Sequence, residues 1–200
     1  MPADHVILLF SWILYGVLHS VLAARSVKAR AYRLLGKAAP HYRLLYTLFA
    51  FFSLTALLYF QFTMQSRPLF SRSTFSLLAG VTAVIAGAVL MAICIGKYFM
   101  SLSGIRSLLN EEEGGTLMIS GVHRYMRHPL YLGTFIFIWG LFLLFPLLSH
   151  LIACVVITVY TLLAIPFEEA KLVAQFGEDY RRYQRQVPRL LPLRRPFKAS

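Results

Sequence analysis

Two short polar stretches of the sequence carry side chains that could do chemistry. The first places His123, Arg124, Arg127 and His128 immediately before an apolar run that is long enough to enter a bilayer. The second is the adjacent pair Glu168-Glu169, which directly follows another apolar run. Charged groups at the mouth of a membrane segment are costly to remove from water, so they indicate anchoring, topology or a functional site.

The spacing in the first stretch favours an anion site over a metal site. His123 and His128 are five residues apart, about 140° around a helix, and therefore do not share a helical face. Pro129 suits the first turn of a helix, where free backbone amides attract a carboxylate or a phosphate. With Arg124 and Arg127 beside it, this helix start could hold the anionic group of a ligand, and we predict no metal site.

The glutamate pair could supply the opposite charge. Neighbouring residues on a helix point about 100° apart, so one glutamate is expected to face a cationic ligand and the other solvent or an arginine. The alternative is that Pro166 and the two acids simply mark the solvated start of a helix.

Composition and periodicity place both stretches at the ends of membrane helices. Of the 200 residues, 58% are hydrophobic and only 14% are charged, whereas a soluble domain carries roughly a quarter charged residues. Five apolar segments are each long enough to cross a hydrocarbon core of about 30 Å. They cover about residues 6–24, 44–64, 75–96, 130–148 and 150–167. We therefore predict one all-α integral membrane domain over residues 1–200, with about five transmembrane helices.

A cytoplasmic amphipathic helix is expected after the last apolar segment. Apolar and aromatic side chains recur there at helical spacing, with charged residues between them. We expect Gly177 to interrupt this helix and Pro188 to end it. The stripe that should face inward consists of Leu172, Val173, Phe176, Tyr180 and Tyr183.

The basic residues predict the orientation of the chain. All of the 20 Lys and Arg residues except Arg67 and Arg72 fall in the first loop, the third loop or the C-terminal tail. The positive-inside rule then puts these parts in the cytoplasm and the N-terminus outside. Topology and contact with anionic lipid head groups explain most of the net charge of +12, and no nucleic-acid motif accompanies it.

The two polar stretches resemble a known pair of motifs. Residues 120–133 are similar to the "SGxYxxxRHPxYxG" signature of the isoprenylcysteine carboxyl methyltransferase superfamily. Residues 168–192 are similar to its second motif, "EExxLxxxFGxxYxxYxxxVPxxxP". The resemblance extends over about residues 97–192, the expected catalytic half. The front half, with Leu18-His19-Ser20, Arg25 and residues 42–46, resembles the bacterial NnrU-like, phospholipid-methyltransferase-like branch.

The resemblance implies an S-adenosylmethionine-dependent methyltransferase, expected in the inner membrane of a bacterium. Its partners would be the bilayer and a small or amphiphilic acceptor that offers a carboxyl, thiol or amine. Glu168 would lie at the reacting centre, with Glu169 supporting it. The implied cofactor-binding residues are Gly115, Thr116, Leu117, Met118, His123, Arg127, His128, Pro129, Leu130 and Tyr131. Two positions depart from the family pattern: His123 replaces a tyrosine, and Ala164 replaces an arginine that would hold a substrate carboxylate.

Two other functions stay open from the sequence. The ending of the chain is also similar to that of membrane sterol reductases, which use NADPH. A small lipid-binding or accessory membrane protein without catalytic activity is the third possibility, since His123 and Ala164 alter the family's site.

Overall fold

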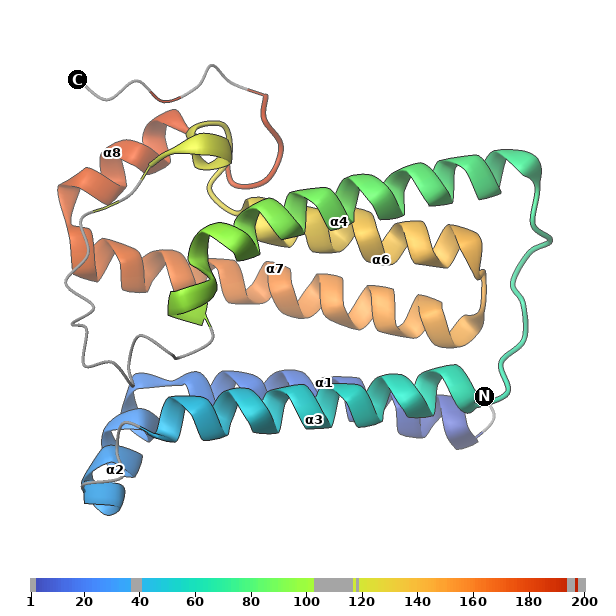
Figure 1. The fold of residues 1–200 in the computed structure, drawn as a ribbon, viewed down its shortest axis with the longest axis horizontal. Helices are drawn as coiled ribbons and strands as arrows, with labels where there is room; N and C mark the ends of the chain where they lie inside the picture. Colours follow the sequence, from blue (N-terminus) through green and yellow to red (C-terminus); the bar gives the residue numbers. More distant parts are fainter. Residues whose placement is uncertain (1–2, 37–40, 103–116, 118, 194–196, 198–200) are drawn as a thin grey trace. The chain divides into compact units, whose positions relative to one another are not determined.

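The computed structural model describes residues 3–36, 41–102, 117, 119–193 and 197, and Figure 1 shows their fold as a ribbon. This part of the chain contains helices and no β-strand, which confirms the predicted all-α class. A single β-bridge joins Pro68 to Leu147. The elements are α1 (Ala3–Ala23), α2 (Arg25–Leu35), α3 (His41–Thr63), α4 (Thr74–Leu102), the 3-10 turn η2 (Gly121–Arg124), α6 (Pro129–Leu144), α7 (Leu148–Phe176) and α8 (Glu178–Gln186).

Four of these helices are long and apolar enough to cross a membrane. They are α1, α3, α7 and the Thr74–Gly96 part of α4. Helix α6 is apolar throughout but has only 16 residues, about 24 Å of helix against a core of about 30 Å. The part of the chain that the structure describes therefore has four helices able to span a bilayer and a fifth, shorter apolar helix, and the protein is an all-α integral membrane protein.

The boundary between the last two apolar segments differs from the expectation. The fourth segment was expected to reach residue 148, but α6 ends at Leu144 because a tight turn and Pro146 follow. The fifth was expected to stop near residue 167, yet α7 continues to Phe176. Pro166 lies inside this helix and does not begin a new one, so the interpretation of Pro166 as a helix start is wrong. A membrane helix tolerates a proline where its neighbours satisfy the backbone group that the proline frees.

The chain divides into two compact units. The first contains α1, α2, α3 and the first turns of α7. Its core is a cluster of buried side chains from α1, α3 and α7: Leu8, Trp12, Leu57, Ile152 and Ala153. Trp12 also donates a hydrogen bond of 2.8 Å to the side-chain oxygen of Gln61, so the one polar group of this tryptophan is satisfied.

The second unit contains most of α4, then α6, the rest of α7 and α8. Within it, α4 and α6 run side by side (Figure 1) and approach closely at glycines. A Cβ atom on Gly87 would lie 2.6 Å from the backbone nitrogen of Phe137, and one on Gly140 would lie 2.8 Å from that of Val84. Small residues permit such backbone contact between membrane helices. This packing positions α6, whose first turn carries the candidate site.

Candidate active site

The turn before α6 is held by the C-terminal segment of the chain. The backbone N–H of Arg127 donates to the carbonyl of Pro188 (3.0 Å), and that of His128 donates to the carbonyl of Arg189 (2.9 Å). The N–H of Phe197 likewise donates to the carbonyl of Arg124 (2.8 Å). These bonds join segments about 60 residues apart, so the two motifs recognised in the sequence form one local structure.

Arg127 and Glu169 form the buried centre of this structure. Both Nε and Nη2 of Arg127 lie 2.7 Å from Oε1 of Glu169, and the two side chains are only 7% and 5% exposed. The remaining Arg127 nitrogen, Nη1, donates to the carbonyls of Gln184 (2.9 Å) and Val187. Oε2 of Glu169 accepts from Nε2 of Gln184 at 3.2 Å and lies 3.4 Å from Nε of Arg189. Glu169 is thus surrounded by donors and serves as a structural counter-charge.

His128 bridges the buried carboxylate and the first turn of α6. Its Nε2 lies 3.1 Å from Oε1 of Glu169, and its ring is buried. The ring stacks on that of Tyr131, with centroids 5.4 Å apart and planes inclined by 10°. On its other side, Nδ1 lies 3.8 Å from Oε2 of Glu168. The imidazole therefore touches both glutamates and has a fixed orientation.

Glu168 differs from its neighbour in being open to its surroundings. Its side chain is 45% exposed, and the hydroxyl of Tyr131 donates a hydrogen bond of 2.7 Å to its Oε2. One carboxylate of the pair is consequently held in the interior by an arginine, and the other is accessible and oriented by a phenol. An accessible, positioned carboxylate can face a cation or accept a proton.

A small aromatic core supports the site from the side of α8. Tyr180, Tyr183 and Val187 pack together with Phe197, and Leu117 lies against them. The hydroxyl of Tyr183 donates a hydrogen bond of 2.5 Å to the carbonyl of His123, and burial raises the pKa of Tyr180 to about 12. The packing of these side chains confirms that the aromatic stripe faces inward. The positive φ of Gly177 (58°) confirms the predicted break between α7 and α8.

The structure brings together part of the predicted site. Arg127, His128, Tyr131 and both glutamates lie in one cluster, and Pro129 is buried at the start of α6. Leu130 follows in the same turn. Gly115, Thr116 and Met118 lie outside the described residues. Among the residues that are described, no group of three or more His, Cys, Asp or Glu side chains could hold a metal ion.

Gln184 and the backbone pairing of residues 127–128 with 188–189 were not anticipated. Gln184 follows Tyr183 in the strongly polar helix α8, where a glutamine gives no sign of a buried contact. The only signal was the Val187-Pro188-Arg189 run in the second motif, which ends the helix at the point where the pairing begins.

Comparison with known proteins identifies the family. The model of the phospholipid methyltransferase family matches residues 75–179, which include α4, α6, α7 and the start of α8. Methanethiol S-methyltransferase 1 of Bradyrhizobium diazoefficiens is 30% identical over 95% of this chain and 67% of its own length. The chain belongs to the phospholipid methyltransferase family. Membership confirms the resemblance to membrane methyltransferases that the two motifs indicated.

Other relatives match over shorter stretches. Methanethiol S-methyltransferase of Crocosphaera subtropica is 46% identical over 35% of this chain and 27% of its own length. Protein-S-isoprenylcysteine O-methyltransferase of Schizosaccharomyces pombe is 31% identical over half of this chain and 47% of its own length. The chain thus spans between about a quarter and two thirds of these three relatives. No solved structure matches.

Proposed function

We propose that this member of the phospholipid methyltransferase family transfers a methyl group from S-adenosylmethionine to a small thiol. The observation that carries the proposal is the asymmetry of the glutamate pair. Glu169 forms a buried ion pair with Arg127, whereas Glu168 stays accessible and is oriented by Tyr131. The accessible carboxylate lies next to the first turn of α6, where the backbone N–H groups of Leu130 and Tyr131 precede the first hydrogen bond of the helix, from Leu132 to the carbonyl of His128.

The residues of this site fit the charges of the cofactor. S-adenosylmethionine supplies a methyl group activated by a positively charged sulfur, and it also carries a carboxylate. The backbone N–H groups of Leu130 and Tyr131 in the first turn of α6 would hold the carboxylate, and Glu168 would favour the positive charge. His128 and Tyr131 would restrict the cofactor's orientation from one side, since their rings are stacked and hydrogen-bonded to the two glutamates.

A thiol suits the site better than a carboxylate acceptor. A carboxylate needs a free cation, but both Arg127 and Arg189 approach Glu169, and Ala164 stands where the carboxyl methyltransferases have an arginine. The curated relatives that bear on this point include several named methanethiol S-methyltransferases. Glu168 would accept the proton as the thiol sulfur forms its bond to the methyl group. The products are a thioether, the demethylated cofactor and a proton that leaves to water.

The remaining expectations about the membrane belong to the same proposal. Residues 1–200 would form one methyltransferase domain with its catalytic half at about 97–192, which is supported by the family match to residues 75–179. The charge distribution supports a cytoplasmic site and tail and an outer N-terminus. The inner membrane of a bacterium is the location that fits this orientation.

A pair of measurements on the purified protein in detergent tests the proposal. First, the thermal stability is measured with S-adenosylmethionine, with NADPH or with neither; only S-adenosylmethionine should raise it. Second, the protein is supplied with S-adenosylmethionine and methanethiol, and dimethyl sulfide is measured in the headspace. Stabilisation by NADPH alone would favour a reductase. Absence of stabilisation by either compound would favour an accessory protein and contradict the proposal.

A further inference from the structure

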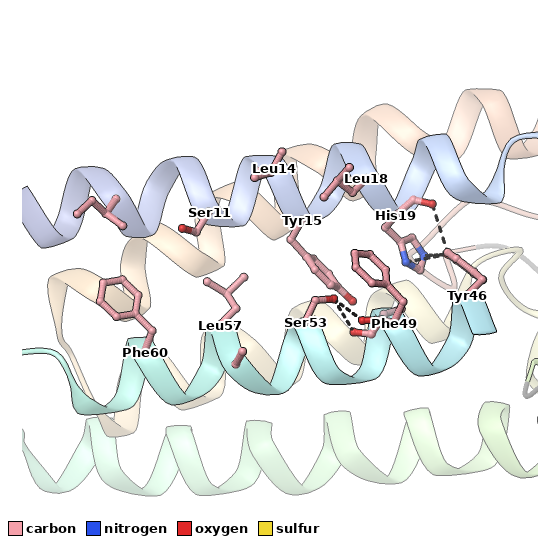
Figure 2. A pocket seen from close by; sticks show the side chains of 13 residues that line it. Ser11, Leu14, Tyr15, Leu18, His19, Tyr46, Phe49, Ser53, Leu57 and Phe60 are labelled. Atoms are coloured by element: carbon pink, nitrogen blue, oxygen red, sulfur yellow. Dashed lines mark hydrogen bonds between the residues drawn. The ribbon is translucent and has the colours of Figure 1, made fainter. Parts of the chain in front are cut away.

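A cavity of about 400 Å³ lies between α1 and α3, entirely within the first compact unit. This volume falls in the range of small-molecule sites. Figure 2 shows side chains of both helices pointing into the space, with His19 and Tyr46 at one end and Phe60 at the other. None of the described residues that line it is Lys, Arg, Asp or Glu, so its body suits an uncharged, hydrocarbon group.

The cavity follows α1 and α3 along several turns, and only one end is clearly polar. Its lining runs along α1 from Ile7 to His19, which is roughly 18 Å of helix and more than half of a 30 Å hydrocarbon core. At the polar end, the hydroxyl of Tyr46 lies 2.8 Å from Nδ1 of His19. Toward the other end the lining is mainly aliphatic and aromatic. These dimensions match one acyl chain of a single leaflet, with a hydrogen-bonding group at its end.

Positive charge gathers next to the polar end. Helix α2 follows α1 after one residue and is joined to the start of α3 by the ring contact of Tyr32 with Tyr42, whose hydroxyl also donates to the carbonyl of Leu22 at 2.8 Å. It carries Arg25, Lys28, Arg30 and Arg33, and no Asp or Glu occurs anywhere between residues 24 and 47. A basic segment beside a membrane helix attracts an anionic lipid head group.

We propose that α1, α2 and α3 bind one anionic phospholipid. One acyl chain fills the cavity, the ester region lies beside His19 and Tyr46, and the phosphate lies at the basic residues of α2. The uncharged lining, the polar end and the basic helix follow one another in the order of a phospholipid's chain, ester and phosphate. The site shares no residue with the Glu168 cluster, and its occupancy does not depend on the proposed methyl transfer.

Native mass spectrometry of the delipidated protein tests the site. The full chain is incubated with vesicles of dioleoyl phosphatidylglycerol or of dioleoyl phosphatidylcholine, and the bound lipid is counted after extraction. We expect one phosphatidylglycerol to remain bound, with at least tenfold preference over phosphatidylcholine. The triple variant Lys28→Gln/Arg30→Gln/Arg33→Gln should lose this preference, and Arg67→Gln, a charge outside this segment, should keep it.

A second variant tests the chain-binding part of the cavity. Ala50 lines the cavity, so Ala50→Phe should reduce retention of phosphatidylglycerol at least fivefold. Ala86→Phe, on an exposed face of α4, is the matched control and should have no effect. Equal retention of both lipids by the wild-type protein, or full retention by Ala50→Phe, would overturn the proposal.

Quenching of Trp12 fluorescence distinguishes lipid bound in the cavity from lipid that surrounds the protein without specificity. Trp12 is buried and its ring lies edge-on to that of Tyr15, 6.1 Å away, which lines the cavity. In a Trp139→Phe background it is the only tryptophan. Brominated phosphatidylglycerol should quench it at least twice as strongly as brominated phosphatidylcholine, and Ala50→Phe should remove the difference. Disulfide-linked dimers of a Ser11→Cys variant would instead assign the cavity to a second copy of the chain.

Discussion

Arg127 and Glu169 form an ion pair that is almost completely removed from solvent. Two guanidinium nitrogens lie 2.7 Å from one carboxylate oxygen, and the third nitrogen donates to the backbone of residues 184 and 187. One side chain thus joins the turn before α6, the end of α7 and the end of α8. Glu168, the preceding residue of α7, stays accessible.

Removal of the arginine alone should strongly destabilise the second unit. In Arg127→Met the carboxylate of Glu169 stays buried without its partner, and breaking such a pair costs about 3–5 kcal/mol. The double variant Arg127→Met/Glu169→Leu removes both charges and should recover part of this loss. Unfolding by denaturant in detergent measures both. A double variant less stable than Arg127→Met would show that the pair is not the main contribution.

Loss of the Glu168 charge should reduce the turnover number more than the affinity for the cofactor. Glu168→Gln removes the charge and the proton acceptor but keeps the shape, so the turnover number should fall by about 10²- to 10⁴-fold. The affinity for S-adenosylmethionine, measured by calorimetry, should change far less. Glu178→Gln, an exposed acid on α8 that pairs with Arg185, is the matched control. Full methyl transfer by Glu168→Gln with a verified acceptor would remove Glu168 from the mechanism.

Tyr131 is expected to act by positioning Glu168. Tyr131→Phe deletes only the hydroxyl that donates 2.7 Å to Oε2 of Glu168. A hydrogen bond to a charged group contributes about 1.5–3 kcal/mol, so the turnover number should fall by tens of fold while thermal stability changes little. The variant pair Tyr131→Phe/Glu168→Gln should be no slower than Glu168→Gln alone. Additive losses would mean that Tyr131 acts independently of the carboxylate.

His128 should matter for binding of the methyl donor. The ring lies between both glutamates and against Tyr131, so His128→Ala opens the wall that we assign to the cofactor. Calorimetry in detergent should show at least tenfold weaker binding of S-adenosylmethionine. His41→Ala, at an exposed position of α3, should bind normally. Unchanged affinity in a folded His128→Ala protein would place the cofactor elsewhere.

The close approach of α4 and α6 predicts opposite effects at two glycines of the same helix. Gly87→Ala would place a methyl group 2.6 Å from the backbone of α6, so the helices must separate and the melting temperature should fall by several degrees. Apart from the neighbouring backbone of α4 itself, no atom of the described residues lies within 4 Å of the equivalent position at Gly96. Gly96→Ala should therefore be neutral or slightly stabilising, since alanine favours a helix by about 1 kcal/mol.

The sequence predicted the class and the pair of motifs because each depends on local information. Apolar length reveals a membrane helix, and the residues of each motif are contiguous in the chain. The end of α7 was mistaken because a proline at residue 166 has the same local signature at a helix start and inside a packed membrane helix. The difference between Glu168 and Glu169 could be expected, but the partner of each could not. Which glutamate meets Arg127 depends on the rotation of α7 against the turn before α6.

The backbone bonds from residues 127 and 128 to residues 188 and 189 have a consequence for the order of events during synthesis. The helices can enter the bilayer one after another as the chain emerges from the ribosome. The turn before α6 must then wait about 60 residues for the carbonyls that fix it. A product that stops before Pro188 would be inserted and retained in the membrane, yet it would lack the segment that closes the site. Membrane insertion and acquisition of activity are therefore separate events in time.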